Sequence, residues 1–470
     1  MKSFTFSRLA LRVLCGASMS LIFLFASPCF AQQRWERNYG GAGEDQGRSV
    51  QQTSDGGYIV AGRTGSYPNY DVYLIKTNAT GDTLWTRTYG TGSDVGDSVQ
   101  QTTDGGYIIA GFTTFGNDYQ VYLIKTNSSG DTLWTRAYGG TVVDVGYSVQ
   151  QTTDRGYIVA GYTQLFGNDY NVYLVKTNTS GDTLWTRTYG GTGTDVGWSV
   201  RQTQDSGYIV AGYTNSFGNN DQVYLVKTNA QGGTLWTRTY GGTGTDRGYS
   251  VQQTSDGGYI VAGQTLSFGN ASQVYLIKTN ASGDTLWTRN YGGTDDDWGW
   301  SVQQTSDGGY IVAGGTYSFG NGEQVYLIKT NASGGTLWTR TYGGAVDEDG
   351  QSVQQTSDGG YIVGGHTTSF GNGYQVYLIK TDANGSSGVE ETAGVRDQGL
   401  GIRVTARPNP FTSFAQVPGH EREAFALYDI SGRKMGTYKG DRIGEGLRAG
   451  VYFLRPEGKD AKPVRVVKVR

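Results

Sequence analysis

Short stretches in which polar residues alternate with β-branched or aromatic residues recur along most of the chain, with glycine between them. Residues 198–241 hold four such stretches, at 199–203, 208–214, 223–229 and 234–240. Val, Ile, Thr and Tyr favour the pleated strand, and glycine allows the positive φ of a tight turn. The pattern therefore predicts four antiparallel strands, joined by two tight turns and by a longer loop at 215–222.

This four-stranded segment is one copy of a repeat. A tryptophan in a Thr-Leu-Trp-Thr-Arg-Thr-Tyr-Gly-Gly context returns at spacings of 50, 49, 51, 51, 51 and 51 residues. The tryptophans are Trp35, Trp85, Trp134, Trp185, Trp236, Trp287 and Trp338. A four-stranded sheet that is apolar on both faces is not stable alone, so the copies must stack on one another. A repeat of this length with four strands predicts the blades of a β-propeller.

The number of blades and the closure of the ring also follow from the repeat. The first strand of each copy begins with a Ser-Val pair, at 49–50, 98–99, 148–149, 199–200, 250–251, 301–302 and 352–353. The last copy lacks its tryptophan strand, and that strand stands instead at residues 34–39. We expect residues 34–39 to pair into the last blade, because no sheet is then left short. The prediction is an all-β fold, with a closed seven-bladed β-propeller over residues 32–385.

The first 31 residues have the character of a signal peptide. Lys2, Arg8 and Arg12 form a basic leader, residues 21–25 are the densest part of an apolar run, and Ala31 ends it. Both cysteines of the chain, at positions 15 and 29, lie in this segment, so the exported product would contain none. A lipid on Cys29 is the alternative, although a proline precedes it where such a site has a small residue.

The C-terminal part differs in composition from the repeats. Residues 386–401 are expected to form a linker, because the repeat ends in the flexible run Ala-Asn-Gly-Ser-Ser-Gly at 383–388. Residues 32–385 carry 20 basic and 31 acidic residues, a net charge of −11, whereas residues 402–470 carry 14 and 7, a net charge of +7. Alternating stretches at 424–429, 450–454 and 464–469 predict a small β-sandwich over residues 402–470.

Two families are similar to parts of this chain. The phrases Trp-x-Arg-x-Tyr-Gly-Gly, Asp-x-Gly and Gly-Tyr-Ile-Val-Ala-Gly-x-Thr-x-Ser-Phe-Gly resemble repeats of exported bacterial seven-bladed propellers. The motifs at 407–411, 427–435, 447–453 and 464–470 resemble the C-terminal sorting domain of type IX secretion (Por secretion) cargo, although Arg407 replaces the tyrosine common before Pro-Asn-Pro. By this resemblance the sorting motif comprises Asn409, Pro410, Phe411, Asp429, Gly432, Arg433, Gly450 and Tyr452. The resemblance implies export across an outer membrane, followed by removal or surface anchoring of the tail; an accessory Ig-like sandwich is the alternative.

Candidate binding residues lie on one rim of the predicted ring. The turns after the first and third strands are nearly uniform, whereas the loops after the second strand vary, and binding sites belong on variable loops held by a rigid scaffold. The candidates are the aromatics Tyr147, Trp198, Tyr249, Trp298 and Trp300, with Asn219, Asp221 and Glu323. They could form a platform that stacks on sugar rings and accepts hydroxyl hydrogen bonds. Alternatively, the aromatics plug the central channel or pack between blades.

Charged residues recur in register with the repeat. An acid occurs two residues before a loop glycine in every copy, which favours a turn cap over catalysis or calcium binding, because a catalytic site must be asymmetric. Weak metal candidates are the denser runs that contain Asp295, Asp297, Asp347 and Asp349, although neither has the spacing of a calcium loop. We expect the lysines of the third strands and the arginines of the fourth strands to pair between blades with turn acids such as Asp82 and Asp131.

These observations favour a secreted or outer-surface binding module that reaches its location through the periplasm. Only two histidines are present, which removes His-based triads and multi-histidine zinc sites. The net charge of −3 gives no reason to expect nucleic acid. The expected partners are the secretion machinery and an extracellular glycan or protein, with no cofactor and a monomeric state. The alternatives are an endoglucanase-like hydrolase that acts on extracellular polysaccharide and a purely structural surface protein.

Overall fold

The computed structural model describes residues 34–388 apart from 67, 91, 117, 165–168, 219 and 372, and residues 414–417, 422–429, 433–456 and 464–468. The predicted signal peptide and most of the predicted linker lie outside these ranges. The chain divides between Gly394 and Val395 into two compact units. Within the described ranges we find no apolar helix of membrane-spanning length.

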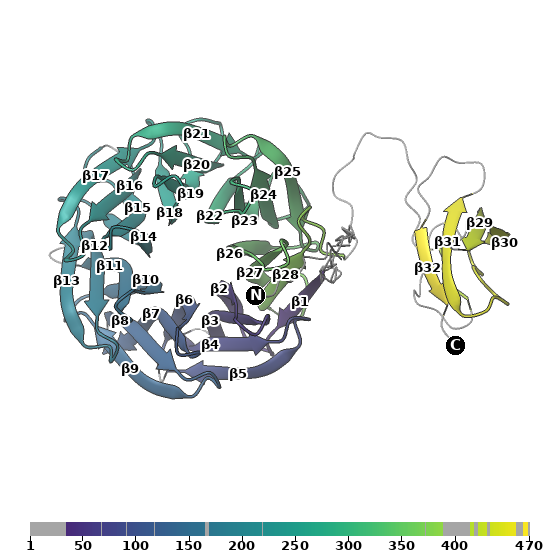
Figure 1. Cartoon of the computed structure of the whole chain (residues 1–470), viewed down its shortest axis with the longest axis horizontal. Coiled ribbons are helices and arrows are strands. Elements are labelled where there is room, and N and C mark those ends of the chain that lie inside the picture. Colours follow the sequence, from purple (N-terminus) through teal and green to yellow (C-terminus); the bar gives the residue numbers. More distant parts are fainter. Residues whose placement is uncertain are drawn as a thin grey trace, which may run out of the picture. The chain divides into compact units, whose positions relative to one another are not determined.

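The first unit is a ring of seven four-stranded antiparallel sheets (Figure 1), which confirms the predicted propeller. The innermost strands are β2 (Gln46–Gln52), β6 (Asp94–Gln101), β10 (Asp144–Gln151), β14 (Asp195–Gln202), β18 (Asp246–Gln253), β22 (Asp297–Gln304) and β26 (Glu348–Gln355). The second strands are β3 (Tyr58–Ser66), β7 (Tyr107–Phe115), β11 (Tyr157–Gln164), β15 (Tyr208–Thr214), β19 (Tyr259–Thr265), β23 (Tyr310–Thr316) and β27 (Tyr361–Thr367).

The outer half of each blade completes the sheet. The third strands are β4 (Asn69–Thr77), β8 (Asp118–Thr126), β12 (Tyr170–Thr177), β16 (Gln222–Thr228), β20 (Gln273–Thr279), β24 (Gln324–Thr330) and β28 (Gln375–Thr381). The outermost strands are β5 (Thr83–Tyr89), β9 (Thr132–Tyr138), β13 (Thr183–Tyr189), β17 (Thr234–Tyr240), β21 (Thr285–Tyr291), β25 (Thr336–Tyr342) and β1 (Trp35–Tyr39). We number the blades 1 to 7 from the one that begins with β2.

The two ends of the repeat region close the ring, as predicted. Strand β1 pairs antiparallel with β28, with Trp35 opposite Lys380 and Tyr39 opposite Val376. Trp35 is buried, and its indole N–H donates to the carbonyl of Ala79 in blade 1. The first strand of the chain therefore completes blade 7 and contacts the blade that follows it around the ring.

The cores lie between the blades. One cluster joins Ile209 and Leu225 of blade 4 to Tyr259 and Ile277 of blade 5. Both faces of each sheet are covered in this way, which explains why the second and third strands are almost continuously buried. Each blade therefore depends on its two neighbours for the burial of its apolar side chains.

The innermost strands begin earlier than the sequence suggested. In blade 4 the strand begins at Asp195, four residues before the serine that marked its start in the repeat, and a bulge lies between Gly197 and Ser199. The bulge places one additional residue, Trp198, on the innermost strand near its beginning. The residues that precede each serine are thus part of the strand.

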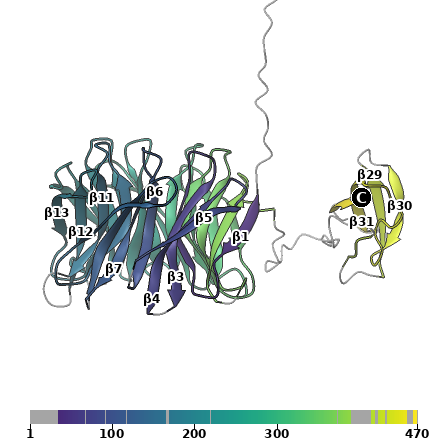
Figure 2. The same cartoon turned by 90° about the horizontal axis from the view of Figure 1, so that it is seen from below.

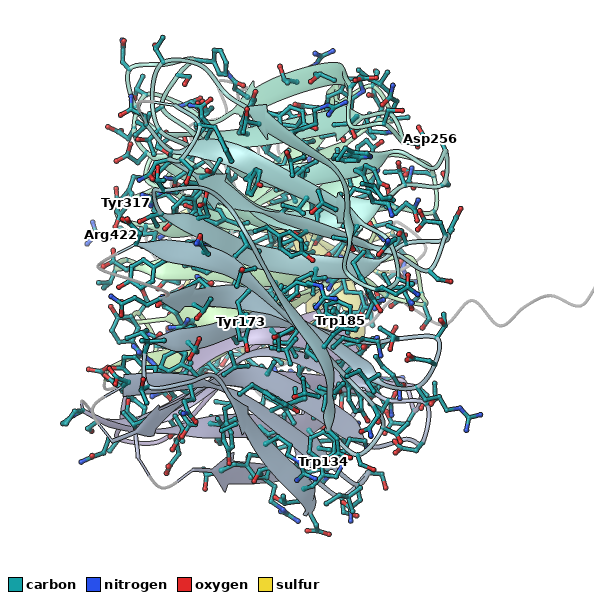
Figure 3. The ribbon with its side chains drawn as sticks, turned by 90° about the vertical axis from the view of Figure 1, so that its left-hand side faces the viewer. Trp134, Tyr173, Trp185, Asp256, Tyr317 and Arg422 are labelled. Carbon is teal, nitrogen blue, oxygen red and sulfur yellow. The ribbon has the colours of Figure 1, made fainter. Side chains whose placement is uncertain are left out.

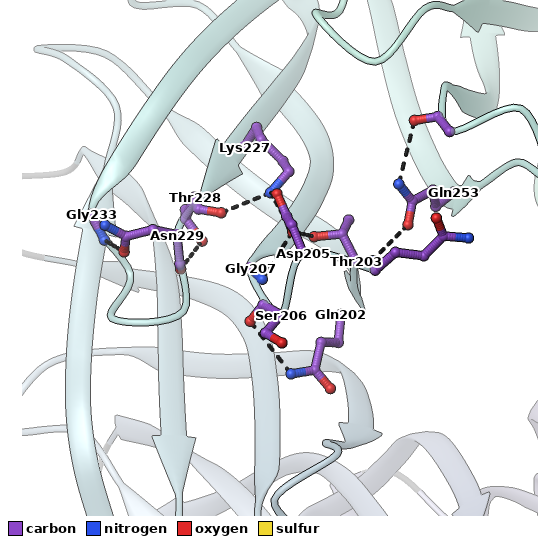
Figure 4. A network of polar contacts seen from close by, with 12 residues as sticks. Gln202, Thr203, Asp205, Ser206, Gly207, Lys227, Thr228, Asn229, Gly233 and Gln253 are labelled. Carbon is purple, nitrogen blue, oxygen red and sulfur yellow. Dashed lines mark hydrogen bonds and ion pairs between the residues drawn. The ribbon is translucent and has the colours of Figure 1, made fainter.

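A lysine and an aspartate link the strands within each blade (Figure 4). In blade 4, Lys227 Nζ lies 2.8 Å from Asp205 Oδ2, and Asp205 Oδ1 accepts hydrogen bonds from the Thr203 hydroxyl at 2.5 Å and the Gly207 amide at 3.0 Å. The prediction that these lysines pair between blades is wrong, because the turn after the innermost strand folds back over the third strand of its own sheet. The arginine prediction is confirmed for Arg87, which lies 3.4 Å from Asp131 of the next blade.

Side chains along the channel connect each innermost strand to the next blade. The serine hydroxyl of one blade accepts a hydrogen bond from the backbone amide of the next, as from Val200 N to Ser148 Oγ at 3.2 Å. A glutamine carbonyl does the same two residues later, as from Gln202 N to Gln150 Oε1 at 2.6 Å. Because an innermost strand has a free edge, these bonds satisfy backbone donors that the sheet leaves unpaired.

The strands of the propeller run between two rims (Figure 2). Asp256, in a turn after an innermost strand, and Tyr317, in a loop after a second strand, lie at opposite rims (Figure 3). We call the rim with Tyr317 the variable rim, because the loops that differ among the copies lie there.

The described residues of the second unit form one four-stranded antiparallel sheet in the order β30-β29-β31-β32. Its strands are β29 (Ala424–Asp429), β30 (Lys434–Lys439), β31 (Gly450–Pro456) and β32 (Val464–Lys468). Phe425, Leu427, Ile443 and Leu454 form its core, and Ala415 forms a bridge with Ile443. The unit is β in structure, as expected, and a second sheet of the predicted sandwich stays a prediction.

Two turns contain a non-glycine residue with a positive φ at a position where the other blades have glycine. Ser206 and Arg155 have φ values of 65° and 67°, whereas the equivalent glycine in blade 5, Gly257, has 82°. A side chain in this left-handed region costs about 1–2 kcal/mol. We expect Ser206→Gly and Arg155→Gly each to raise the free energy of unfolding by about 0.5–1 kcal/mol, after the added flexibility of glycine is subtracted. Thermal unfolding measures the effect. Gln204→Gly, in the same turn as Ser206, is the control, and an equal gain there would contradict the explanation.

Candidate functional site

Four of the five predicted aromatics pack against one another. The rings of Tyr147 and Trp198 are stacked, with centroids 4.1 Å apart and planes 10° apart. Tyr249 and Trp300 lie 4.3 Å apart, and Trp198 contacts Tyr249 edge-on at 5.4 Å. These four residues come from consecutive blades, so the cluster connects blades 3 to 6. Much of their ring surface is covered by the other rings, which supports the packing interpretation for this cluster.

Trp298 and Trp300 are connected through a carboxylate of the next blade. Both lie on β22, and both indole N–H groups donate to Asp349 of β26, at 3.4 Å to Oδ1 and 2.7 Å to Oδ2. The Gln351 side-chain amide donates to the same Oδ2 at 2.5 Å. Asp349 therefore fixes the two indoles at the boundary between blades 6 and 7.

Glu323 completes this group from the loop between β23 and β24. The Tyr317 hydroxyl donates to Glu323 Oε2 at 3.3 Å, and the Tyr317 ring contacts Trp298 edge-on at 5.8 Å. A Cβ added to Gly315 would lie 2.7 Å from the Trp298 ring and 2.9 Å from Glu323 Oε1. Glycine at 315 thus leaves room for the indole and the carboxylate to lie side by side. We call Trp298, Trp300, Tyr317, Glu323 and Asp349 the Trp298 sector.

The two acids of the sector have altered protonation. Burial, and then the charge of Asp349, raise the pKa of Glu323 to about 8. Burial raises the pKa of Asp349 to about 6, although the bonds from Trp300, Trp298 and Gln351 oppose the shift. At neutral pH the pair therefore retains a proton, chiefly on Glu323, so this side chain can donate as well as accept a hydrogen bond.

The other predicted polar residues lie elsewhere or are already paired. Asp221 forms an ion pair with Arg247, 2.5 Å from Nη2, and the Arg247 guanidinium lies 4.7 Å from the Tyr213 ring centre. Asn219 lies outside the described residues. Asp221 belongs to the boundary between blades 4 and 5, whereas Glu323 lies in the Trp298 sector, and a site that they share stays a prediction.

A cationic pair occupies the boundary of blades 1 and 2. Arg48 lies 2.7 Å from Asp97, and the Arg63 guanidinium lies 4.2 Å from the Tyr70 ring centre. Burial and the charges of Arg48 and Arg63 lower the pKa of His366 to about 4, so this imidazole is neutral at pH 7. The variable rim thus carries acids and bases in different sectors.

The recurring acids act as turn caps, as the repetition suggested. Asp297 Oδ2 accepts hydrogen bonds from the Gly293 amide at 2.9 Å and from the Ser318 hydroxyl at 2.7 Å. Asp347 Oδ1 accepts from the Glu323 amide at 3.4 Å, while Asp295 contributes its backbone carbonyl to Ser318. Within the described ranges no group of three or more His, Cys, Asp or Glu side chains is arranged to hold a metal ion.

The sequence pattern did not identify Gly315, Tyr317 and Gln351 as candidate site residues, and it indicated Asp349 only as a metal candidate. The signal was available in the copies. The position of Trp298 is valine in blades 2 to 4, and the other four copies depart from it, with Gln46, Arg247, Trp298 and Asp349. At the position of Gly315 every other copy has a larger side chain. The two positions together single out blade 6, where both depart from the other copies.

The described part of the predicted sorting motif lies on β29, on β31 and at Arg433, immediately before β30. Arg433 Nε lies 3.1 Å from Asp429 Oδ2, and the Arg433 amide donates to Asp429 Oδ1 at 3.1 Å. Tyr452 is buried and donates to the Arg448 carbonyl at 2.9 Å, and Gly450 begins β31. Asn409, Pro410, Phe411 and Gly432 lie outside the described residues.

The raised pKa of Glu323 predicts a pH-dependent stability. The folded protein retains a proton that the unfolded chain releases near pH 4.5, so the free energy of unfolding falls as the pH rises from about 4.5 to about 8. Glu323→Gln removes this titration. Between pH 5 and 8 we expect the melting temperature of the parent protein to fall relative to the variant by about 2 °C or more. Asp169→Asn, which removes an exposed carboxyl on the same rim, should follow the parent curve; parallel curves for all three proteins would exclude a raised pKa at Glu323.

Three solved structures are similar to this chain in outline. Sqt1 from Chaetomium thermophilum is 9% identical, with 75% of this chain and 98% of that chain covered and a TM-score of 0.46. The Pan2 WD40 domain of Neurospora crassa is 9% identical, with 73% and 89% covered and a TM-score of 0.46. A protein of unknown function from Dyadobacter fermentans DSM 18053 is 12% identical, with 75% and 97% covered and a TM-score of 0.42.

No family model matches the chain, and no curated protein matches it. At these identities and TM-scores the three structures carry no argument about the site. The fold therefore rests on the chain's own strand pairing, and any function must be argued from the residues of the variable rim.

Proposed function

We propose that this chain is an exported binding protein whose propeller holds an extracellular glycan at the Trp298 sector. The fold is a propeller, which is typical of interaction modules. The observation that carries the proposal is the placement of aromatic rings beside a carboxyl group that can both donate and accept hydrogen bonds. Sugars offer apolar C–H faces that stack on such rings and hydroxyl groups that need both kinds of partner.

The sector presents both features to solvent. The Tyr317 side chain is 43% exposed and lies against the partly buried Trp298 ring, so an aromatic surface is accessible at the rim. Glu323, whose pKa is raised, lies next to the Trp298 indole and accepts a hydrogen bond from the Tyr317 hydroxyl. A ligand that covers Tyr317 would reach the Glu323 carboxyl, which supports a site for one or a few sugar residues.

The sector also supplies the asymmetry that a ring of similar blades lacks. Trp298, Gly315, Glu323 and Asp349 each depart from the residues at the equivalent positions of most other blades. They lie on neighbouring blades and in contact, so the departures gather at one boundary. A single site of this kind distinguishes a ligand-binding rim from a uniform structural ring.

Substitution of the aromatics tests the glycan site. We expect Tyr317→Ala to reduce retention on an array of extracellular polysaccharides by about 10-fold or more, because the exposed stacking surface is lost. Trp298→Ala should do the same, with an additional loss of thermal stability because Trp298 also packs over Gly315. Phe268→Ala, which removes a 50% exposed aromatic in the loop of another blade, is the matched control.

The outcomes separate the three candidate functions. Loss of binding in Tyr317→Ala with the parent melting temperature supports a glycan site, whereas unchanged retention refutes it. Turnover of soluble polysaccharide that Glu323→Gln abolishes would favour a hydrolase, since a protonated Glu323 near Asp349 resembles the acid of a carboxylate pair. If the stably folded parent protein retains no glycan on the array, a structural surface protein is favoured.

We further propose that residues 1–31 direct the chain to the periplasm and that residues 402–470 direct it across the outer membrane through type IX secretion. The sorting motif supports this route, and two of its residues, Asp429 and Arg433, form an ion pair. The tail's net charge of +7 and its separate compact unit support an independent role.

Deletion of residues 402–470 tests the export route in a host with this secretion system. We expect the shortened protein to accumulate in the periplasm and the full chain to reach the medium or the cell surface, as measured by fractionation. The control is the melting temperature of the shortened protein, which should match that of the propeller in the full chain. Normal release of the shortened protein would refute the sorting assignment.

A further inference from the structure

One residue of the central channel breaks the pattern of its ring. Two positions after each channel serine, six blades have a glutamine and blade 4 has an arginine. The ring consists of Gln51, Gln100, Gln150, Arg201, Gln252, Gln303 and Gln354. All seven line the cavity on the propeller axis, around which the innermost strands are arranged (Figure 1).

The six glutamines have a defined structural task. Each side-chain carbonyl accepts a hydrogen bond from a backbone amide of the next blade, as from Gln101 N to Gln51 Oε1 at 2.6 Å and from Gln355 N to Gln303 Oε1 at 2.5 Å. A carboxamide that accepts through its oxygen keeps two N–H donors on its nitrogen. The ring therefore leaves amide donors at the wall of the channel.

Arg201 cannot perform this task. A guanidinium has five N–H donors and no acceptor, so it offers nothing to the amide of Gln253 at the equivalent place in blade 5. One Arg201 N–H group donates to the carbonyl of Val200 at 3.0 Å. Among the described residues Arg201 forms no ion pair. Arginine in place of the glutamine of the other blades thus removes one bond between blades and adds a positive charge.

The surroundings of this charge are neutral. The cavity has a volume of about 220 Å³, and its other lining residues are serine, valine and glutamine. Burial lowers the pKa of Arg201 from its usual 12.5, and no neighbouring carboxylate opposes the shift. A guanidinium nevertheless remains charged at neutral pH. Arg201 is half-buried, and a charge that is partly removed from water without a partner favours a ligand of opposite charge.

We propose that Arg201 binds a small oxyanion in the central channel. The planar guanidinium donates two parallel hydrogen bonds to oxyanions such as phosphate, sulfate and carboxylates. The glutamines of the same ring keep amide N–H donors, which would supply hydrogen bonds to the remaining oxygens of the anion. The cavity has room for an inorganic anion or a small organic acid, and serine and glutamine side chains from most blades line it. This site is independent of the Trp298 sector, because none of the five residues of that sector lines the cavity.

Arg201→Gln tests the proposal, because we expect its stability relative to the parent protein to change in opposite directions in chloride and in phosphate. In chloride the variant should be at least as stable as the parent protein, because it removes the unpaired charge and restores the seventh glutamine. In phosphate at the same ionic strength we expect the melting temperature of the parent protein to rise by about 2–4 °C, and that of Arg201→Gln to remain unchanged. Parallel series in sulfate and acetate identify whether a tetrahedral or a carboxylate oxyanion is preferred.

Calorimetric titration with inorganic phosphate gives the second readout. We expect binding to weaken 10-fold or more in Arg201→Gln and less in Arg201→Lys, which keeps the charge without the paired donors. Arg238→Gln is the control, because Arg238 is an exposed arginine on an outer strand. An equal phosphate response in the parent protein and Arg201→Gln, or undiminished affinity in that variant, would overturn the proposal. If Arg201→Gln does not fold, Arg201→Lys replaces it: we expect a smaller loss of phosphate affinity, and affinity equal to that of the parent protein would overturn the proposal.

Discussion

The propeller depends on how the free edges of its innermost strands are satisfied. Each innermost strand pairs on one side only, so its other backbone amides need acceptors. The preceding blade supplies them from a serine hydroxyl, as Ser148 does for Val200, and from a glutamine carbonyl two residues later. Because every blade satisfies the next one, the last must satisfy the first, and Ser352 accepts from Val50 in this way. Closure of the ring follows from the same requirement that makes the blades alike.

Positions outside this requirement are free to differ. The variable rim lies where the innermost strand begins, before the serine bond, and the side chains there contact neighbours in ways that change from blade to blade. At one boundary Asp221 pairs with Arg247, whereas at another Glu323 lies beside Trp298 with a raised pKa. The channel differs, because six of its seven ring positions hold a glutamine that is constrained by a bond to the next blade, and Arg201 departs from them. Function in such a ring is expected where the repeat is broken.

The repeat alone was sufficient for the blade number, the pairing of β1 with the last blade and the division into two rims. These features follow from the alternation of polar and apolar residues along each strand and from the length of the repeat, both of which can be read directly in the sequence. The repeat did not determine which acid each lysine meets. Lys227 pairs with Asp205 because the intervening turn folds over its own sheet, and a distance of 22 residues in sequence gives no sign of that. The innermost strands were also placed too late, because the bulge after Gly197 interrupts the alternation.

The sequence by itself determined the architecture of this protein: seven sheets, closed by their own N-terminal strand, with a separate basic β unit. It also identified the non-repeating aromatics as the place to look. Only the tertiary structure separated them, since Tyr147, Trp198 and Tyr249 pack mainly with one another and with Trp300, while Trp298 lies against Tyr317 at the rim. Trp298 and Asp349 occupy equivalent repeat positions on neighbouring blades, and their side chains meet across the blade boundary. Such contacts depend on side-chain rotamers and on the space left by residues such as Gly315. The period of the repeat encodes neither of these.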